Sequence, residues 1–155
     1  MSAALRIDAG DLDHPAVRAL LDHHLREAHR NSPPGSVYAL DLSGLRRPEV
    51  ALWTAWDGAT LLGCGALRAL AADHGEIKSM RTAPSALRRG VGATLLDHMI
   101  GVARGRVYRR LSLETGSGEA YAPALALYER HGFQLGPAFG DYRATDFNRF
   151  MHLDL

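Results

Sequence analysis

Hydrophobic positions along the chain follow two periods, which mark helices and strands. From His14 to Arg30 the apolar residues fall on one helical stripe, and Asp13 before Pro15 is a start signal, so a helix is predicted there. The Pro-Pro-Gly sequence within Asn31–Gly35 ends this helix. The chain from there to Pro48 is predicted to be irregular, with weak helical pieces.

The rest of the chain alternates between strand and helix. Hairpins come first, one of them turning at Asp57-Gly58, and single strands alternate with helices afterwards. This order predicts one domain over residues 1–155 with a mixed α/β fold, a mostly antiparallel central sheet and helices on both faces. The predicted strands are Leu5–Asp8, Glu49–Trp56, Thr60–Leu70, Gly75–Thr82, Arg109–Glu114 and Phe147–Leu155, and the later helices are Arg88–Arg104 and Ala120–His131.

Composition and charge narrow the function classes. Apolar residues make up 46% and charged residues 23% of the chain, as in a folded globular domain. A formal net charge of +1 gives no broad basic field, so we expect no nucleic-acid partner. Neither the start, Met1 to Gly10, nor any later stretch has the apolar run of about 18 residues that a membrane span needs. We therefore expect no membrane partner and a cytoplasmic location.

Cysteine and histidine give no metal or redox site. Cys64 is the only cysteine, which excludes an intramolecular disulfide and a thiolate zinc site, and we expect it in the core. His23, His24 and His29 lie on the first predicted helix, but their spacing matches no metal motif, and we interpret them as a solvated helix face. Ser117 lacks the Gly-x-Ser-x-Gly surroundings of a hydrolase nucleophile.

The most informative segment is the loop Leu87–Gly92, Leu-Arg-Arg-Gly-Val-Gly, which follows a predicted strand and opens a helix. Glycine lets the backbone approach a ligand, and the first turn of a helix presents unpaired N–H groups at the positive end of its dipole. With the charges of Arg88 and Arg89 the loop suits a pyrophosphate. The alternative is a tight connection whose glycines serve only the turn. The spacing matches neither the Gly-x-Gly-x-x-Gly dinucleotide motif, since Leu95 takes the third position, nor the Gly-Lys-Ser/Thr of NTPases.

Three segments resemble, in order and spacing, the GNAT superfamily of N-acetyltransferases. The loop is similar to the family's acetyl-CoA loop, Gln/Arg-x-x-Gly-x-Gly/Ala, although Leu87 stands where the family has Gln or Arg, which should weaken binding without abolishing it. Glu76–Thr82, followed by Pro84, resembles the fourth strand of the family. Ala126–Phe133 resembles the late helix ending in Tyr-x-x-x-Gly-Phe, so the resemblance spans Glu49 to Phe133.

The resemblance implies acetyl-CoA as co-substrate and no metal. The loop backbone would hold the pyrophosphate, a threonine hydroxyl would add a bond, and the pantetheine arm would pair with the fourth strand like an extra strand. The residues so implied are Met80, Arg81, Thr82, Arg88, Arg89, Gly90, Val91, Gly92, Ala93 and Thr94.

Acetyl transfer to an amine requires a base, a donor to the oxyanion and an acid for the thiolate. The resemblance places the base at Glu76, whose alternative role is a solvated carboxylate at a strand end. Glu114, ending the next strand, is the rival base or an anchor for a cationic amine. Tyr128 is the implied acid, and its alternative role is a ring packed in the core. A backbone N–H at Met80 would meet the oxyanion.

The acceptor is the part of the site that the sequence describes least. In this fold the segments Arg26–Leu42 and Gly136–Phe147 would select it, and the aromatic loop Phe139–Arg143 could close over a small substrate. No large acidic groove for a basic peptide is evident, so a small-molecule amine or amino acid is favoured. The alternatives are a protein or peptide amine and a non-catalytic acyl-CoA sensor. A homodimer is left open.

Overall fold

The fold is built on one mixed sheet of seven strands. The computed structural model describes residues 5–155 and orders the strands β1-β2-β3-β4-β5-β7-β6. Within that range β4 and β5 form the one parallel pair and every other neighbouring pair is antiparallel, which confirms the predicted sheet. The strands are β1 (Arg6–Ala9), β2 (Val50–Asp57), β3 (Thr60–Ala71), β4 (His74–Thr82), β5 (Arg110–Thr115), β6 (Gln134–Leu135) and β7 (Arg149–Asp154).

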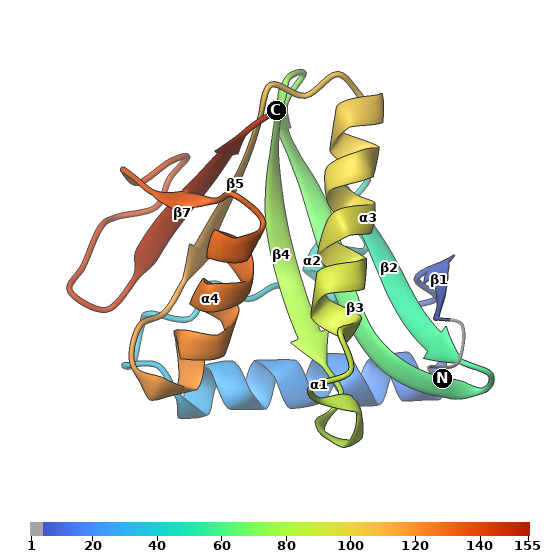
Figure 1. The fold of residues 1–155 in the computed structure, drawn as a ribbon. Coiled ribbons are helices and arrows are strands. Elements are labelled where there is room, and N and C mark those ends of the chain that lie inside the picture. The colour runs from blue at the N-terminus through green and yellow to red at the C-terminus, as the bar shows by residue number, and fades with distance from the viewer. Residues whose placement is uncertain (1–4) are drawn as a thin grey trace.

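Helices cover both faces of the sheet, as predicted (Figure 1). One face carries α1 and α2, and the other carries α3 and α4, with α3 forming the crossover between the parallel strands. The helices are α1 (Pro15–Arg30), α2 (Leu42–Leu45), α3 (Val91–Gly105) and α4 (Ala122–Arg130), and the short 3-10 turns are η1 (Pro84–Ala86) and η2 (Glu119–Tyr121).

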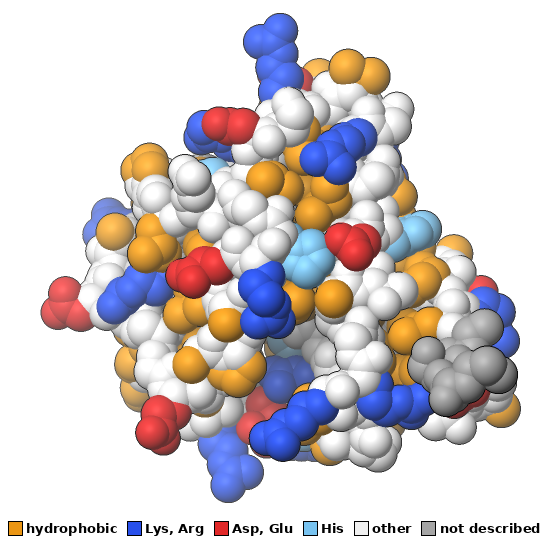
Figure 2. Space-filling view, in the orientation of Figure 1, with side chains coloured by type: hydrophobic (Ala, Val, Ile, Leu, Met, Phe, Trp, Pro, Cys, Tyr) orange, Lys and Arg blue, Asp and Glu red, His pale blue; other side chains and the backbone are white. Residues whose placement is uncertain are grey.

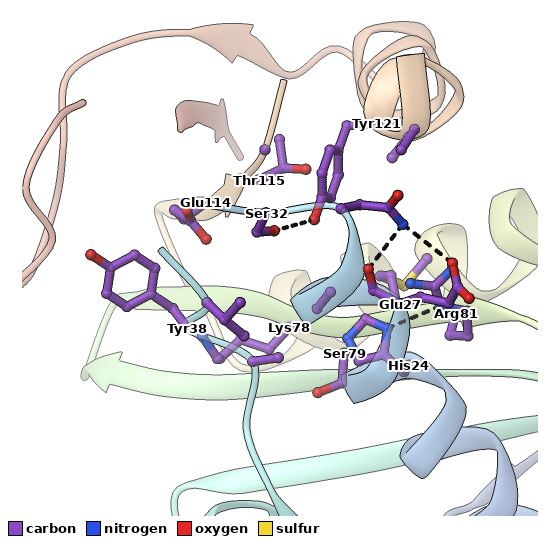
Figure 3. A pocket seen from close by; sticks show the side chains of 18 of the residues that line it. His24, Glu27, Ser32, Tyr38, Lys78, Ser79, Arg81, Glu114, Thr115 and Tyr121 are labelled. Carbon is purple, nitrogen blue, oxygen red and sulfur yellow. Dashed lines mark hydrogen bonds between the residues drawn. The ribbon is translucent and has the colours of Figure 1, made fainter. Parts of the chain in front are cut away.

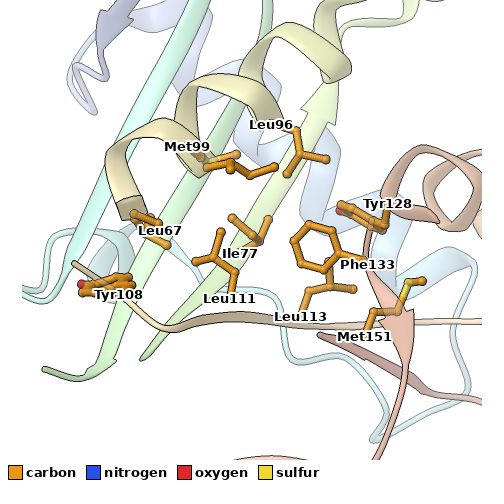
Figure 4. Close-up of a cluster of buried hydrophobic side chains, with 12 residues drawn as sticks. Leu67, Ile77, Leu96, Met99, Tyr108, Leu111, Leu113, Tyr128, Phe133 and Met151 are labelled. Carbon is orange, nitrogen blue, oxygen red and sulfur yellow. The ribbon is translucent and has the colours of Figure 1, made fainter. Parts of the chain in front are cut away.

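The main core lies between the sheet and the pair α3 and α4. Leu96 and Met99 of α3 contact Leu111 and Leu113 of β5 there, while Tyr128 joins the core from α4 (Figure 4). A second cluster packs α1 and α2 against β2 and β3 on the opposite face. Cys64 is fully buried in this second cluster, as predicted. The main cluster includes Ile77 of β4 and Leu111 of β5, so it packs against both strands of the parallel pair.

Two helix starts differ from the predictions, each for a local reason. The third helix begins at Val91 rather than Arg88, because Arg88 and Gly90 adopt positive φ angles of 65° and 77° that a helix cannot contain. The first helix is capped by His14, whose Nδ1 accepts the N–H of Ala16 at 3.1 Å. The predicted cap, Asp13, instead pairs with the guanidinium groups of two arginines.

The irregular segment before Pro48 contains α2, in line with the weak helical pieces predicted there, whereas β6 was not predicted. The two residues of β6 are exposed and pair with β7, so no burial pattern marks them in the sequence. Basic and acidic side chains are interspersed over the face shown in Figure 2. Between residues 5 and 155, no helix is long and apolar enough to cross a membrane.

Candidate active site

The parallel strands β4 and β5 pair only at their beginnings. Their ladder runs from His74 with Arg110 to Glu76 with Ser112, and beyond it the strands diverge toward α1 (Figure 1). Elsewhere β4 stays paired with β3, and β5 with β7, so only the two facing edges lose their partners. A pocket of about 190 Å³ lies at this divergence, lined from α1, β4, the end of β5 and α4.

A bulge in β4 determines which side chains reach this pocket. Cys64 and Ala66 of β3 are two residues apart, whereas their partners Arg81 and Lys78 on β4 are three apart. The bulge includes Ser79, whose φ is 55°. Residues three apart in a regular strand point to opposite faces, but here Lys78 and Arg81 line the same pocket (Figure 3).

Glu114 brings a carboxyl group to the pocket from the end of β5 (Figure 3). Burial raises the pKa of Glu114 to about 7, and the charge of Glu76 raises it further, whereas Lys78 acts in the opposite direction. A carboxyl group with a pKa near neutrality can exchange a proton with an amine at physiological pH. Glu114 therefore has the position and the acidity expected of a general base.

Tyr128 reaches the pocket from the last turn of α4. Its ring is buried and meets Phe133 edge-on, with ring centroids 5.8 Å apart. Its hydroxyl makes no hydrogen bond to any of the described residues, which leaves its proton free for a ligand. Burial raises the pKa of Tyr128 to about 12, against a small opposing effect of Arg81, so the hydroxyl stays protonated at any ordinary pH.

Glu76 is only 1% exposed and is not among the residues that line the pocket. Its Oε2 accepts hydrogen bonds from the Tyr142 hydroxyl and from Lys78 Nζ, the latter at 3.4 Å, while its Oε1 lies 3.9 Å from the Arg68 guanidinium. The alternative of a solvated carboxylate is thus wrong. The structure brings Glu114 and Tyr128 to the pocket, whereas Glu76 does not line the pocket and contacts Tyr142 and Lys78 instead.

The predicted phosphate loop retains the open geometry that a ligand needs. A side chain at Gly90 would meet no heavy atom within 4 Å, and no side chain caps the first turn of α3. The hydroxyl of Thr94 donates to the Gly90 carbonyl at 2.9 Å, so it would have to leave that bond to donate to a phosphate. Arg89 contacts Asp57 at 3.3 Å, which offsets part of its charge. Arg88 is exposed as well, and no ion pair with the described residues offsets its charge.

Sequence reasoning missed two pocket residues, His24 and Lys78. His24 was interpreted as solvated, yet it lines the pocket and its Nδ1 accepts from Arg81 Nε at 3.0 Å. The signal was present, because His24 continues the helical stripe of Val17, Leu20 and Leu21. Lys78 is the one lysine of the chain and lies within a strand, and a lysine that is buried there needs a partner of opposite charge.

A contact between two aromatic side chains links the two segments that are predicted to select the acceptor, Arg26–Leu42 and Gly136–Phe147. Tyr38, from the segment after α1, lines the pocket and meets Tyr142 edge-on at 5.2 Å between ring centroids. Tyr142 belongs to the predicted aromatic loop, which is packed through Phe139 against β7. In the part of the chain that the structure covers, no group of three or more His, Cys, Asp or Glu side chains could hold a metal ion.

A sheet that opens at its parallel pair, beside a helix that begins after a glycine, offers main-chain partners to an amide-containing arm and a helix N-terminus to a phosphate. A Klebsiella pneumoniae protein assigned as an acyl-CoA N-acyltransferase has the same fold, with a TM-score of 0.82, 28% identity and 99% of both chains covered. Residues 17–133 match the model of the acetyltransferase (GNAT) family. The chain belongs to this family and is an N-acetyltransferase.

A relative and a ligand-bound structure agree with this assignment. The uncharacterized N-acetyltransferase YedL of Escherichia coli is 47% identical, over 96% of this chain and 94% of YedL. A GNAT acetyltransferase from Elizabethkingia anophelis, solved with acetyl-CoA bound, has the same fold, with a TM-score of 0.67, 18% identity and 97% of this chain and 98% of that chain covered. The family uses acetyl-CoA as its acyl donor, as predicted.

Proposed function

We propose that this protein transfers the acetyl group of acetyl-CoA directly to the amine of a small molecule or an amino acid. The observation that carries the proposal is the pocket where β4 and β5 diverge. It contains a carboxyl group with a pKa near 7, Glu114, and a buried phenolic hydroxyl without a hydrogen bond to the described residues, Tyr128. These are the proton acceptor and the hydrogen-bond donor that amide formation from a thioester requires.

The donor would bind along the edge of β4 and at the start of α3. Beyond Glu76 the β4 edge has no strand partner on its β5 side, so its main-chain groups are available to the amides of pantetheine. The first turn of α3 offers the N–H groups of Val91, Gly92 and Ala93 to the pyrophosphate, with Arg88 adding charge. The main chain of Met80, Arg81 and Thr82 and the loop Arg88–Thr94 form the proposed donor site.

The reaction needs one bond made and one broken, with one proton moved. Glu114 takes a proton from the amine as its nitrogen attacks the thioester carbon, and a backbone N–H at Met80 stabilises the oxyanion. Collapse breaks the C–S bond and releases the thiolate; Glu114 gives the amine proton to solvent, and the thiolate takes one proton from solvent, so the protons balance. Because a thiol has a pKa of about 8.5, Tyr128 holds its own proton more firmly and acts as a hydrogen-bond donor to the leaving sulfur while proton transfer to sulfur is completed.

The acceptor side of the pocket favours a small substrate. The edge-on contact between Tyr38, which lines the pocket, and Tyr142 narrows the approach from the acceptor side and so favours a compact amine. The alternatives are a protein or peptide amine, which would have to enter as a single terminal residue, and a sensor that binds acyl-CoA without turnover.

One assay separates these functions. Free thiol release from acetyl-CoA is measured with a panel of small amines and amino acids, and with peptides that carry the same N-terminal residues. We expect release with a subset of the small acceptors and none with the peptides. Release only with peptides would favour the protein acceptor, and acetyl-CoA binding without release in any mixture would favour the sensor.

Gly90→Asp should weaken acetyl-CoA binding by about tenfold or more, because it places a negative charge where the pyrophosphate approaches. The open space around Gly90 lets the new side chain fit without a clash. Gly35→Asp is the matched control, since Gly35 also has a positive φ, 81° against 77°, and open surroundings. Calorimetry on both variants checks the prediction, and equal affinities would remove the loop from the donor site.

A further inference from the structure

Arg81 is a pocket cation without a carboxylate partner. Its Nε donates to His24 Nδ1 at 3.0 Å, and its two Nη groups make no hydrogen bond or ion pair with any residue from 5 to 155. Burial, followed by the charge of Arg81, lowers the pKa of His24 to about 4, so His24 is neutral and holds the guanidinium in place without offsetting its charge. The two Nη groups, which form the outer edge of the guanidinium, are therefore held in one orientation and have no partner among the described residues.

The other charges around the pocket are already matched. Lys78, which is 8% exposed, is balanced by Glu76 at 3.4 Å. Glu27 pairs with Arg30 at 3.6 Å and accepts from Asn31 at 3.2 Å. Arg81 is thus the pocket cation that no ion pair among the described residues offsets.

We propose that the acceptor of this enzyme carries a carboxylate beside its amine, and that the two Nη groups of Arg81 bind this carboxylate. The proposal rests on the acetyl transfer proposed above and narrows its substrate class to amino acids and related amino carboxylates. Figure 3 shows Arg81 beside His24, on the opposite side of the drawn pocket from Glu114. An amino carboxylate held between them would direct its carboxylate to Arg81 and its amine toward Glu114.

A carboxylate fits this position better than a phosphate. The two Nη groups form a planar pair of donors that matches the two oxygens of a carboxylate. A phosphate monoester carries close to two negative charges at neutral pH and would meet the carboxyl groups of Glu27 and Glu114 in the same small pocket. The anions of acetyl-CoA are assigned to the loop at Gly90, and the Arg81 side chain instead points to His24 of α1.

The first test compares acceptors on the unmodified enzyme. Thiol release is measured with L-amino acids, with the matching L-amino acid amides and with the matching aminophosphonates. An unselective site would favour the amides, because their less basic amine is more often neutral. We expect kcat/KM to be at least about tenfold higher for the acids, the size of effect that a charged hydrogen-bonding pair gives. A preference for amides or aminophosphonates would overturn the proposal.

The second test removes the charge at Arg81. Arg81→Gln should lower the ratio of kcat/KM for the acids to kcat/KM for the amides by about 10- to 100-fold, and this ratio cancels any effect on the donor that both acceptors share. Arg81→Lys keeps the charge but loses the planar fork, so it should restore only part of the activity. Arg104→Gln, on the exposed side of α3, is the control and should behave as wild type. An equal loss on acids and amides, or a raised KM for acetyl-CoA alone, contradicts the assignment.

A binding measurement keeps the two proposals separable. Calorimetry of N-acetyl-L-amino acids, and of their amides, on the CoA-loaded protein reports the carboxylate contact without turnover. Binding of the acids that Arg81→Gln abolishes supports the contact even if no amine is acetylated, which would then count against the proposed catalysis alone. Acetylation of amines combined with equal binding of acids and amides rejects the carboxylate contact alone.

Discussion

Glu114→Gln should lower kcat by about 10²- to 10⁴-fold, the range that general-base catalysis contributes. The substitution keeps the shape of the side chain and removes its ability to accept a proton. In the wild type, kcat/KM should rise as the pH increases through about 7, the pKa of Glu114, because only the ionised carboxylate acts as a base. The Glu114→Gln variant should lose this rise of kcat/KM near pH 7, which is the limb of the pH profile that Glu114 causes. Steady-state kinetics between pH 5.5 and 9 measure both effects.

Two controls identify the base. Glu129→Gln alters an exposed glutamate of α4 and should change nothing. Glu76→Gln disturbs the contacts with Tyr142 and Lys78, so it should lower stability while the limb near pH 7 persists. If Glu76→Gln removes the limb and Glu114→Gln does not, the base is Glu76, as the family resemblance implied.

The same pKa predicts a change in stability. Glu114 binds its proton more tightly in the folded protein than in the unfolded chain, where its ordinary pKa is 4.5. Its effect on stability is therefore neutral below about pH 4.5 and becomes unfavourable as the pH rises from there to about 7. Glu114→Gln removes this effect, so Tm should increase more at pH 8 than at pH 5. Thermal melts at both values check that the fold is intact and that Glu114 is indeed desolvated.

Tyr128→Phe should lower kcat by about 10²-fold with little change in the KM for acetyl-CoA, since only the hydrogen bond to the negative charge that develops on the leaving sulfur is lost. The ring and its edge-on contact with Phe133 remain, so the fold should survive. A pKa of about 12 keeps the hydroxyl protonated, so its loss should lower the rate across the pH range without removing the limb near pH 7. Single-turnover measurements of thiol release isolate the chemical step.

Tyr108→Phe is the matched control for this change. Tyr108 is buried in the same hydrophobic cluster, but its hydroxyl accepts a bond from Arg106 rather than facing the pocket. Its removal should leave kcat unchanged. Equal rates for Tyr128→Phe and wild type in the chemical step would assign Tyr128 to core packing alone.

Local patterns in the sequence were enough for most of the sheet and for the helices, because these depend on periodicity and on glycine, whereas phosphate binding by the loop before α3 stays a prediction. The start of α3 was misplaced because a positive φ at a non-glycine residue, Arg88, leaves no mark in the residue type. The placement of Lys78 and Arg81 in one pocket could not be predicted for a similar reason, since strict alternation along a strand assigns the two side chains to opposite faces. The pKa of Glu114 depends on burial by elements far apart in the chain, and no local pattern encodes it.

The bulge in β4 gives this strand two kinds of ligand contact: main-chain contacts, which do not depend on residue type, and side-chain contacts, which a substitution changes. If the donor is held by the main chain of this strand, its binding is largely insensitive to which side chains the strand carries. The acceptor would instead be recognised by side chains that the three-residue step at Ser79 turns toward α1, Arg81 among them. Substitutions at this position can then retune the acceptor while acetyl-CoA binding persists, so a single nine-residue strand can serve enzymes of different specificity.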